Sequence, residues 1–90
     1  MILTNLITLT ATPQQVVGPA IQRQIVHLHN QNKSSNNYIH FGNQTVSTTN
    51  SPHLDPGESK ILTLEPHDTL WAVSDPSGLE LGVLIVRQSQ

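Results

Sequence analysis

Aliphatic residues alternate with uncharged polar residues along most of this chain, and charged residues rarely interrupt them. The pattern is clearest in segments 1–10 (MILTNLITLT) and 21–30 (IQRQIVHLHN). A repeat of two residues places successive side chains on opposite faces of a strand, whereas a helix needs a repeat near 3.6. The sequence therefore predicts β-strands with one apolar face and one face turned to water or to a partner.

Turn-forming residues separate these strands. Asp55-Pro56-Gly57-Glu58 has proline and glycine at the central positions of a type II turn. A helix over residues 20–30 is an alternative, but Pro19 and the β-branched pair Ile25-Val26 argue against it. About seven or eight short strands predict an all-β fold, either an antiparallel β-sandwich or a small jelly-roll-like barrel. The further strand-like segments are 14–17, 38–42, 59–64, 69–74 and 79–87.

The 90 residues predict a single β domain, 1–90, in which residues 1–12 form an extended N-terminal strand or arm. A domain of this size buries only roughly 60–65% of the surface that its unfolded chain exposes. The sequence has no cysteine, so it offers neither a disulfide nor a thiolate. We therefore expect extra stability to come from packing or association.

Charge and hydropathy argue against two classes of partner. The formal net charge is −2, and the basic residues Arg23, Lys33, Lys60 and Arg87 are scattered, whereas nucleic-acid binding needs clustered cations. No stretch approaches the roughly 18 apolar residues of a membrane span. The aliphatic start also lacks the basic region and long apolar core of a secretory signal. We expect no nucleic-acid and no membrane partner.

Two hairpins and one fully covered strand follow from the local pattern. Residues 25–29 are expected to pair with residues 38–42 through a polar loop. Asp75-Pro76-Ser77-Gly78 is expected to close a second hairpin into residues 79–87. The unbroken aliphatic run from Val83 to Val86 is typical of a strand that is covered on both faces.

Five histidines are many for so short a chain. If His29 lies opposite Tyr38 in the first hairpin, His27 lies opposite His40. His27, His29 and His40 then share a face that could bind zinc, copper or nickel, or respond to pH between about 5 and 7. No carboxylate lies nearby in sequence to orient the rings. The favoured interpretation is therefore an exposed or subunit-facing sheet surface, with no metal and no cofactor.

The other polar groups predict no catalytic centre. The carboxylates mostly flank proline or glycine, where they stabilise turns, and no nucleophile elbow is present. Trp71 has aliphatic neighbours, which favour a core or interface anchor over a carbohydrate-stacking platform. The N-terminal segment Met1 to Leu9 is able to add a strand to a neighbour. The interface residues expected from these patterns are Ile2, Leu3, Leu6, Ile25, His27, His40 and Trp71.

Five short motifs follow one another in a fixed order. They are Arg23-x-x-Val26-x-Leu28-x-Asn30, Tyr38-Ile39-x-Phe41-Gly42, Val46-Ser47, Leu54-x-Pro56-Gly57-Glu58 and Leu70-Trp71-Ala72-Val73-Ser74. Over about residues 8–86 the chain resembles small β-sandwich virion proteins of tailed bacteriophages, of the head-decoration or cement type. Related domains also occur in tail and fibre proteins. His40 and Phe41 depart from the commoner hydrophobic-Gly ending, which leaves the contact surface there undetermined.

The resemblance implies a protein without catalysis that binds the outside of an assembled phage head. Such a protein clamps neighbouring subunits of the major capsid protein, commonly as a homotrimer at threefold or quasi-threefold positions. It would be made in the host cytoplasm and reside on the outer surface of the virion capsid. Two alternatives stay open: a tail- or fibre-associated β-sandwich that binds a receptor or glycan, and a metal-dependent enzyme of cupin-like type built on the histidines.

Overall fold

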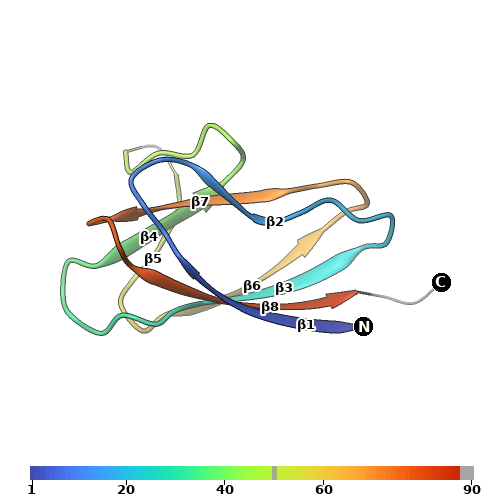
Figure 1. Ribbon diagram of the computed structural model, residues 1–90, viewed down its shortest axis with the longest axis horizontal. Coiled ribbons are helices and arrows are strands. Elements are labelled where there is room, and N and C mark those ends of the chain that lie inside the picture. Colours follow the sequence, from blue (N-terminus) through green and yellow to red (C-terminus); the bar gives the residue numbers. More distant parts are fainter. Residues whose placement is uncertain (50, 88–90) are drawn as a thin grey trace.

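Eight β-strands make up the part of the chain that the computed structural model describes, residues 1–49 and 51–87 (Figure 1). No helix occurs in this part, and so it contains no helix that could cross a membrane. The all-β prediction is confirmed. The strands are β1 (Ile2–Thr8), β2 (Gln14–Val17), β3 (Gln24–Asn30), β4 (Tyr38–Gly42), β5 (His53–Leu54), β6 (Ser59–Leu64), β7 (Leu70–Asp75) and β8 (Glu80–Arg87).

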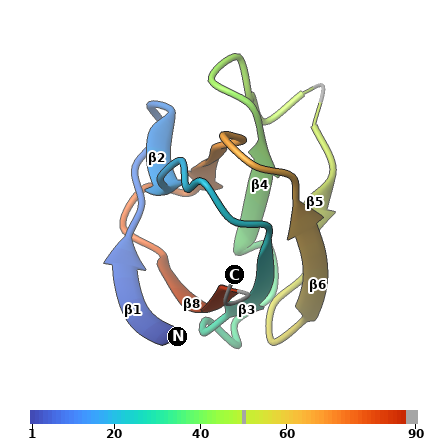
Figure 2. The ribbon, with the colours of Figure 1, turned by 90° about the vertical axis from the view of Figure 1, so that its right-hand side faces the viewer.

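The strands form two antiparallel sheets that curve around a common core (Figure 2). Sheet A has the order β1-β8-β3-β6, and sheet B has the order β2-β7-β4-β5. β1 pairs with β8, β2 with β7, β3 with β6 and β4 with β5, so the first half of the chain pairs with the second half in reverse order. This is the arrangement of an eight-stranded jelly roll. The predicted β-sandwich is therefore confirmed.

Consecutive strands lie in different sheets at every connection except that from β4 to β5. Both predicted hairpins are therefore wrong. β3 pairs with β6 and β8, and β4 pairs with β5 and β7, so residues 25–29 do not pair with residues 38–42. The segment from Asp75 to Gly78 carries the chain from β7 in sheet B to β8 in sheet A, without joining two paired strands.

The inward faces of the two sheets bury an aliphatic core. Val26 and Leu28 point into it from β3, while His27 between them is exposed, as the alternation predicted. Burying a Val, Leu, Ile or Phe side chain completely contributes about 1.5–3 kcal/mol to folding. The core cluster comprises Leu9, Val16, Val17, Val26, Leu28, Ile39, Phe41, Leu54, Leu64, Leu70, Ala72, Leu79, Leu81, Val83 and Ile85.

Asn30 ends β3 as a fully buried residue, 0% exposed. Its Nδ2 donates to the backbone carbonyls of Asn37 at 2.9 Å and Leu54 at 3.2 Å. Its Oδ1 accepts from the backbone N–H of Asn32 at 3.1 Å and from the Asn32 side-chain amide at 2.9 Å. We call this side chain the Asn30 clamp, because it ties the end of β3 to the start of β4 and the end of β5.

The predicted type II turn joins β5 to β6. The backbone N–H of Glu58 donates to the carbonyl of Asp55 at 2.9 Å, and Gly57 has a φ of 76°. The Glu58 carboxylate also accepts from the backbone N–H of Asp55 at 2.7 Å. Proline presets the first central position of the turn, and glycine supplies the positive φ of the second.

Replacing Gly57 with alanine is expected to lower the free energy of unfolding by about 1 kcal/mol, because a Cβ is strained at positive φ. No atom lies within 4 Å of the position that the Cβ would take, so crowding adds nothing. Gly18→Ala is the matched control, since its site is equally open and its φ is ordinary. Thermal unfolding measures both variants, and equal melting temperatures would contradict the strain argument.

Residues 1–12 fold onto the chain's own sandwich. β1 forms one edge of sheet A, and all seven of its residues stay in register with β8, from Ile2 opposite Val86 to Thr8 opposite Glu80. Leu9, directly after the strand, is buried in the core. The N-terminal strand is thus docked on one side by β8, and its other side is a free sheet edge.

Candidate functional site

The two outer faces of the sandwich differ in how they are covered. The connection between β4 and β5 folds over the outer side of sheet B, where Val46 from this connection is buried. His40 and Val73, which point to the same side, are also buried. The Nδ1 of His40 lies 3.2 Å from the backbone carbonyl of Ser51 in that connection. The chain therefore covers much of this face itself.

No described segment covers the outer face of sheet A. Residues directly opposite each other in an antiparallel ladder point to the same face, so the strand registers define its members. We call this surface the bare face. Its side chains are Ile2, Thr4 and Leu6 of β1, Gly82, Leu84 and Val86 of β8, Ile25, His27 and His29 of β3, and Ser59, Ile61 and Thr63 of β6.

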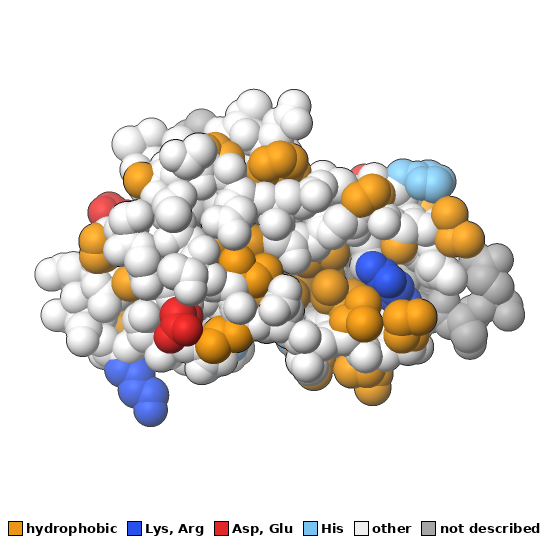
Figure 3. All heavy atoms as spheres, viewed as in Figure 1, with side chains coloured by type: hydrophobic (Ala, Val, Ile, Leu, Met, Phe, Trp, Pro, Cys, Tyr) orange, Lys and Arg blue, Asp and Glu red, His pale blue; other side chains and the backbone are white. Residues whose placement is uncertain are grey.

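Six of the twelve members of the bare face are aliphatic, and none of the twelve is Lys, Arg, Asp or Glu. The register also places Thr8 and Glu80 on this side, where β1 ends and β8 begins. Ile2 is 67% exposed, Leu6 55% and Ile61 62%. Figure 3 shows hydrophobic side chains gathered over the part of the molecule where Figure 1 shows β1 and β8. Contiguous apolar surface of this kind typically marks an interaction site in a soluble protein.

The aliphatic run from Val83 to Val86 contributes side chains to both the core and the bare face. Val83 and Ile85 are buried in the core, but Leu84 and Val86 are only half-buried on the bare face. The prediction that β8 is covered on both faces is therefore wrong for the chain taken alone. An uninterrupted aliphatic strand is typical of a sheet that is covered by a layer on each face. Here the described chain covers only the inner face of sheet A, where the core lies.

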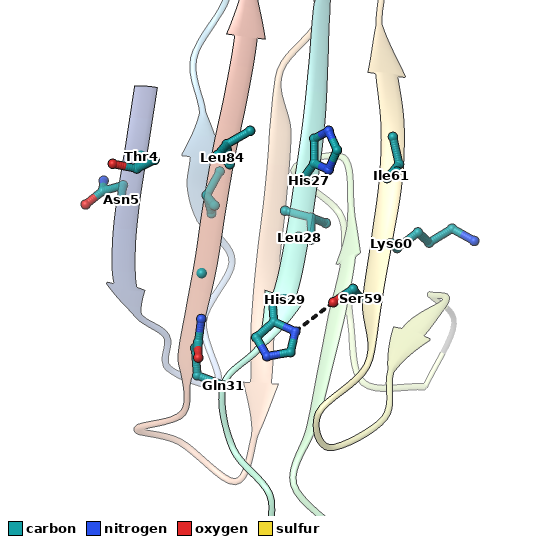
Figure 4. A pocket seen from close by; sticks show the side chains of 12 residues that line it. Thr4, Asn5, His27, Leu28, His29, Gln31, Ser59, Lys60, Ile61 and Leu84 are labelled. Atoms are coloured by element: carbon teal, nitrogen blue, oxygen red, sulfur yellow. Dashed lines mark hydrogen bonds between the residues drawn. The ribbon is translucent and has the colours of Figure 1, made fainter. Parts of the chain in front are cut away.

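A shallow hollow of about 730 Å³ lies on the bare face (Figure 4). It forms beside Gly82, over which the side-chain amide of Gln31 lies, so that a Cβ at position 82 would collide with it. The Nδ1 of His29 is 2.7 Å from the hydroxyl of Ser59, and Figure 4 shows both side chains at one end of the hollow. The hollow therefore offers two imidazole rings, a hydroxyl and a side-chain amide beside aliphatic side chains. Its lining also includes Thr4, Asn5, His27, Leu28, Lys60, Ile61, Val83 and Leu84.

The three histidines predicted to share a face do not lie together. His27 and His29 are on the bare face, whereas His40 lies on the outer side of sheet B, because β3 and β4 belong to different sheets. His40 instead faces His53 across the β4–β5 pair, with ring centroids 5.4 Å apart. Within residues 1–49 and 51–87, no three His, Asp or Glu side chains are grouped so that they could hold a metal ion.

The predicted interface residues divide between three surfaces. Ile2, Leu6, Ile25 and His27 are on the bare face. Leu3 points to the inner side of β1 but remains exposed. His40 and Trp71 lie on the outer side of sheet B. There, Trp71 is half-buried and its Nε1 donates to the hydroxyl of Thr69 at 3.2 Å.

Sequence patterns missed three aliphatic members of the bare face: Ile61, Leu84 and Val86. Each stands next to an aliphatic residue that points to the core, Leu62 for Ile61 and Ile85 for Leu84 and Val86. Aliphatic residues at consecutive positions of a strand were thus the available sign that both of its faces are apolar. Assigning these residues to one surface required the registers between β3, β6 and β8, which join segments distant in sequence.

These features define a small jelly-roll β-sandwich with one uncovered apolar sheet face.

No protein-family model and no curated protein sequence matches the chain. One similar solved structure is a protein of Bacillus endospore appendages, which form disulfide-linked pili. It is 16% identical over 99% of this chain and 90% of that chain, with a TM-score of 0.52. A de novo designed double-stranded β-helix is 15% identical over 98% and 99%, with a TM-score of 0.45, a similarity too low to support a conclusion. The similarity to the endospore appendage protein supports the fold alone.

Proposed function

We propose that this chain is a structural virion protein of a tailed phage, a decoration or cement protein that binds the outside of the assembled head. In this proposal it stabilises contacts between subunits of the major capsid protein and works as a homo-oligomer without catalysis. The observation that carries the proposal is the bare face, an apolar surface on sheet A that the described chain leaves uncovered.

The energetics of the bare face support docking onto another protein. Covering the exposed parts of Ile2, Leu6 and Ile61 would contribute about 1–2 kcal/mol each. Because the one formally charged side chain on this side of the paired strands, Glu80, lies at one end, binding centred on the aliphatic members would not require removing a full charge from water. A polar rim is also present, since Glu80 of β8 and Lys60 of β6 stand beside it.

The size of the bare face indicates more than one contact per assembly. Four strands about 4.8 Å apart, each about seven residues long, cover roughly 450 Å² in plan. A stable protein interface takes about 800 Å² from each partner. Several linked copies on neighbouring subunits would hold more firmly than a single copy.

The motifs behind the phage resemblance add support because they coincide with structural elements. Arg23 to Asn30 covers β3, Leu70 to Ser74 lies in β7, and Leu54 to Glu58 includes the type II turn. The endospore appendage protein suggests that the same fold can serve in a polymer. Because this sequence has no cysteine, its copies cannot be joined by disulfides through it.

Removal of the protein from the source particle tests the function. Heads stripped of this protein are expected to release their genome at a lower temperature than decorated heads, because the added contacts between capsid subunits are lost. Adding the purified chain back should restore the original release temperature. Genome release followed with an intercalating dye during heating measures the effect.

Host adsorption is the accompanying measurement. If stripped and decorated heads were equally robust while adsorption to host cells fell, the decoration proposal would be overturned. The tail- or fibre-associated receptor-binding function would then replace it, and Trp71 on the outer side of sheet B would be the first residue to substitute.

A further inference from the structure

β1 is the least protected of the four sheet edges. β2 has four residues and an irregular register between Gln15 and Val17, and β5 has two residues. β6 carries Lys60. β1 has seven residues in unbroken register with β8, and it contains no proline and no charged side chain. Proteins usually protect exposed edges with short strands, bulges, prolines or charges, so an edge without these devices is suited to pairing with another strand.

The backbone of β1 presents alternate residues to this free edge. The Met1 and Arg87 backbones bond to each other at 3.2 and 2.9 Å, and the Leu9 N–H donates to the Leu79 carbonyl at 2.8 Å. Since the bonded pairs of an antiparallel ladder alternate, the odd-numbered residues of β1 bond to β8. The N–H and C=O groups of the even-numbered residues therefore point away from β8, and these residues are Ile2, Thr4, Leu6 and Thr8.

One of these outward groups confirms the alternation. The N–H of Leu6 donates to the side-chain Oδ1 of Asn5 at 2.9 Å, so a neighbouring side chain occupies a position that a partner strand would take. Asn5 is exposed and this bond is local. It can be exchanged for a ladder hydrogen bond without disturbing the core.

We propose that the free edge of β1 pairs antiparallel with β1 of a second copy of this chain, around a twofold axis at Asn5. The register that overlaps all of residues 2–8 sets Thr4 opposite Leu6 and Leu3 opposite Ile7. Asn5 then faces its own copy. Opposite residues point to the same face, so apolar residues meet on the inner side of the strands and the two Asn5 amides meet each other.

Charge and shape favour a second copy as the occupant. β1 carries no charged side chain, so two copies meet without like-charge repulsion. A hollow of about 250 Å³ lies on the inner side of β1, lined by Leu3, Thr4, Asn5, Val16, Val83 and Ile85. In this register, Ile7 of the second copy comes beside Leu3 at this hollow and covers apolar surface there.

The pairing deepens the proposed function, on which its role at the capsid rests. It joins the bare faces of two copies into one surface, with Ile2 and Leu6 of both copies at the seam. The combined surface covers roughly 900 Å² in plan, about twice that of one copy. A twofold contact gives a dimer, in place of the trimer that the phage resemblance implies.

A cysteine at position 5 tests the register directly. Opposite residues of a non-hydrogen-bonded pair have Cα atoms about 4.5 Å apart, within the range that a disulfide spans. Since the chain has no cysteine, Asn5→Cys introduces the only thiol. Under mild oxidation we expect most of the Asn5→Cys protein to become a covalent dimer on a non-reducing gel.

Thr4→Cys is the matched control, because Thr4 faces Leu6 of the second copy and the two Thr4 positions lie about 8 Å apart, too far for a disulfide. This variant should remain largely monomeric on the same gel. If Asn5→Cys formed no covalent dimer, or no more than Thr4→Cys, the proposed pairing would be overturned.

A proline at position 4 tests the pairing without a covalent bond. Thr4→Pro removes an outward N–H and leaves every β1–β8 hydrogen bond in place, a position at which edge strands tolerate proline. In sedimentation experiments we expect the wild-type dimer to dissociate on the order of micromolar concentration, as for a small interface. Thr4→Pro should raise the dissociation constant at least about tenfold, while Thr4→Val, which keeps the N–H, should not. Far-ultraviolet circular dichroism checks that the variants keep the β fold.

A trimer, or a dimer that Thr4→Pro does not weaken, would overturn the pairing. Binding of the covalent Asn5→Cys dimer to stripped heads separates this inference from the proposed function. A dimer that forms in the predicted register but does not bind heads would refute the capsid role and leave the pairing intact. Wild-type protein that binds heads but sediments as a monomer at all concentrations would refute the pairing and leave the capsid role intact.

Discussion

Asn30→Ala is expected to lower the free energy of unfolding by about 3–4 kcal/mol. The Asn30 clamp satisfies the carbonyls of Asn37 and Leu54 and accepts two hydrogen bonds from Asn32. Removing the amide takes a hydrogen bond from the Leu54 carbonyl, where the bond is buried, and from the part-buried Asn37 carbonyl and Asn32 N–H, and each buried unsatisfied group costs about 1–3 kcal/mol. For a domain of this size, we expect the melting temperature to fall by about 15–25 °C.

Asn43→Ala is the matched control for the clamp. Asn43 also accepts two hydrogen bonds, from the N–H of Thr45 at 2.8 Å and its hydroxyl at 2.6 Å, but it does so within an exposed turn. Water can replace these bonds, so we expect a loss below about 1 kcal/mol. Asn30→Asp keeps the shape but cannot donate to the two carbonyls, so it should be at least as destabilising as Asn30→Ala. Equal melting temperatures for the Asn30 and Asn43 variants would refute the clamp.

Ile61→Asp is expected to weaken binding to stripped heads by at least about 100-fold, with little change in the melting temperature. The side chain is 62% exposed on the bare face, so the isolated protein gains little from it. In the proposed complex, the substitution removes an apolar contact worth about 1–2 kcal/mol. It also places a carboxylate without a partner in the interface, which adds about 2 kcal/mol or more. Co-sedimentation of the labelled chain with stripped heads measures the affinity.

Ile21→Asp is the control for this effect. Ile21 is 67% exposed, but it lies in the connection between β2 and β3, away from the bare face. We expect Ile21→Asp to bind stripped heads as the wild type does. If the two variants bound heads equally well, the bare face would not be the capsid-binding surface, whatever the state of the β1 edge.

The alternation of apolar and polar residues predicted seven of the eight strands described, because the period of two is a local property; the two-residue strand β5 was not predicted. It also placed Val26 and Leu28 inside and His27 outside, as observed. The type II turn at Pro56-Gly57 was predictable for the same reason, since its φ requirements act within four residues.

Strand pairing could not be predicted from local pattern. A hairpin rule assumes that neighbouring strands in sequence pair, but a jelly roll sends nearly every connection to the opposite sheet. His27 and His40 were therefore placed together by an incorrect register. The burial of Asn30, the last residue of the alternating segment 21–30, was not predicted either. Its burial depends on Asn37 and Leu54, which only the folded chain brings to it.

The pairing of β1 with β8 also constrains how the chain can fold. These strands are adjacent in sheet A although nearly the whole sequence lies between them, so closing this pair costs more chain entropy than closing the β4–β5 pair. We infer that β1 docks late on the folding pathway. Until it docks, β8 is itself the open edge of sheet A and can accept β1 from another molecule. Refolding at high concentration therefore favours dimers that exchange this strand.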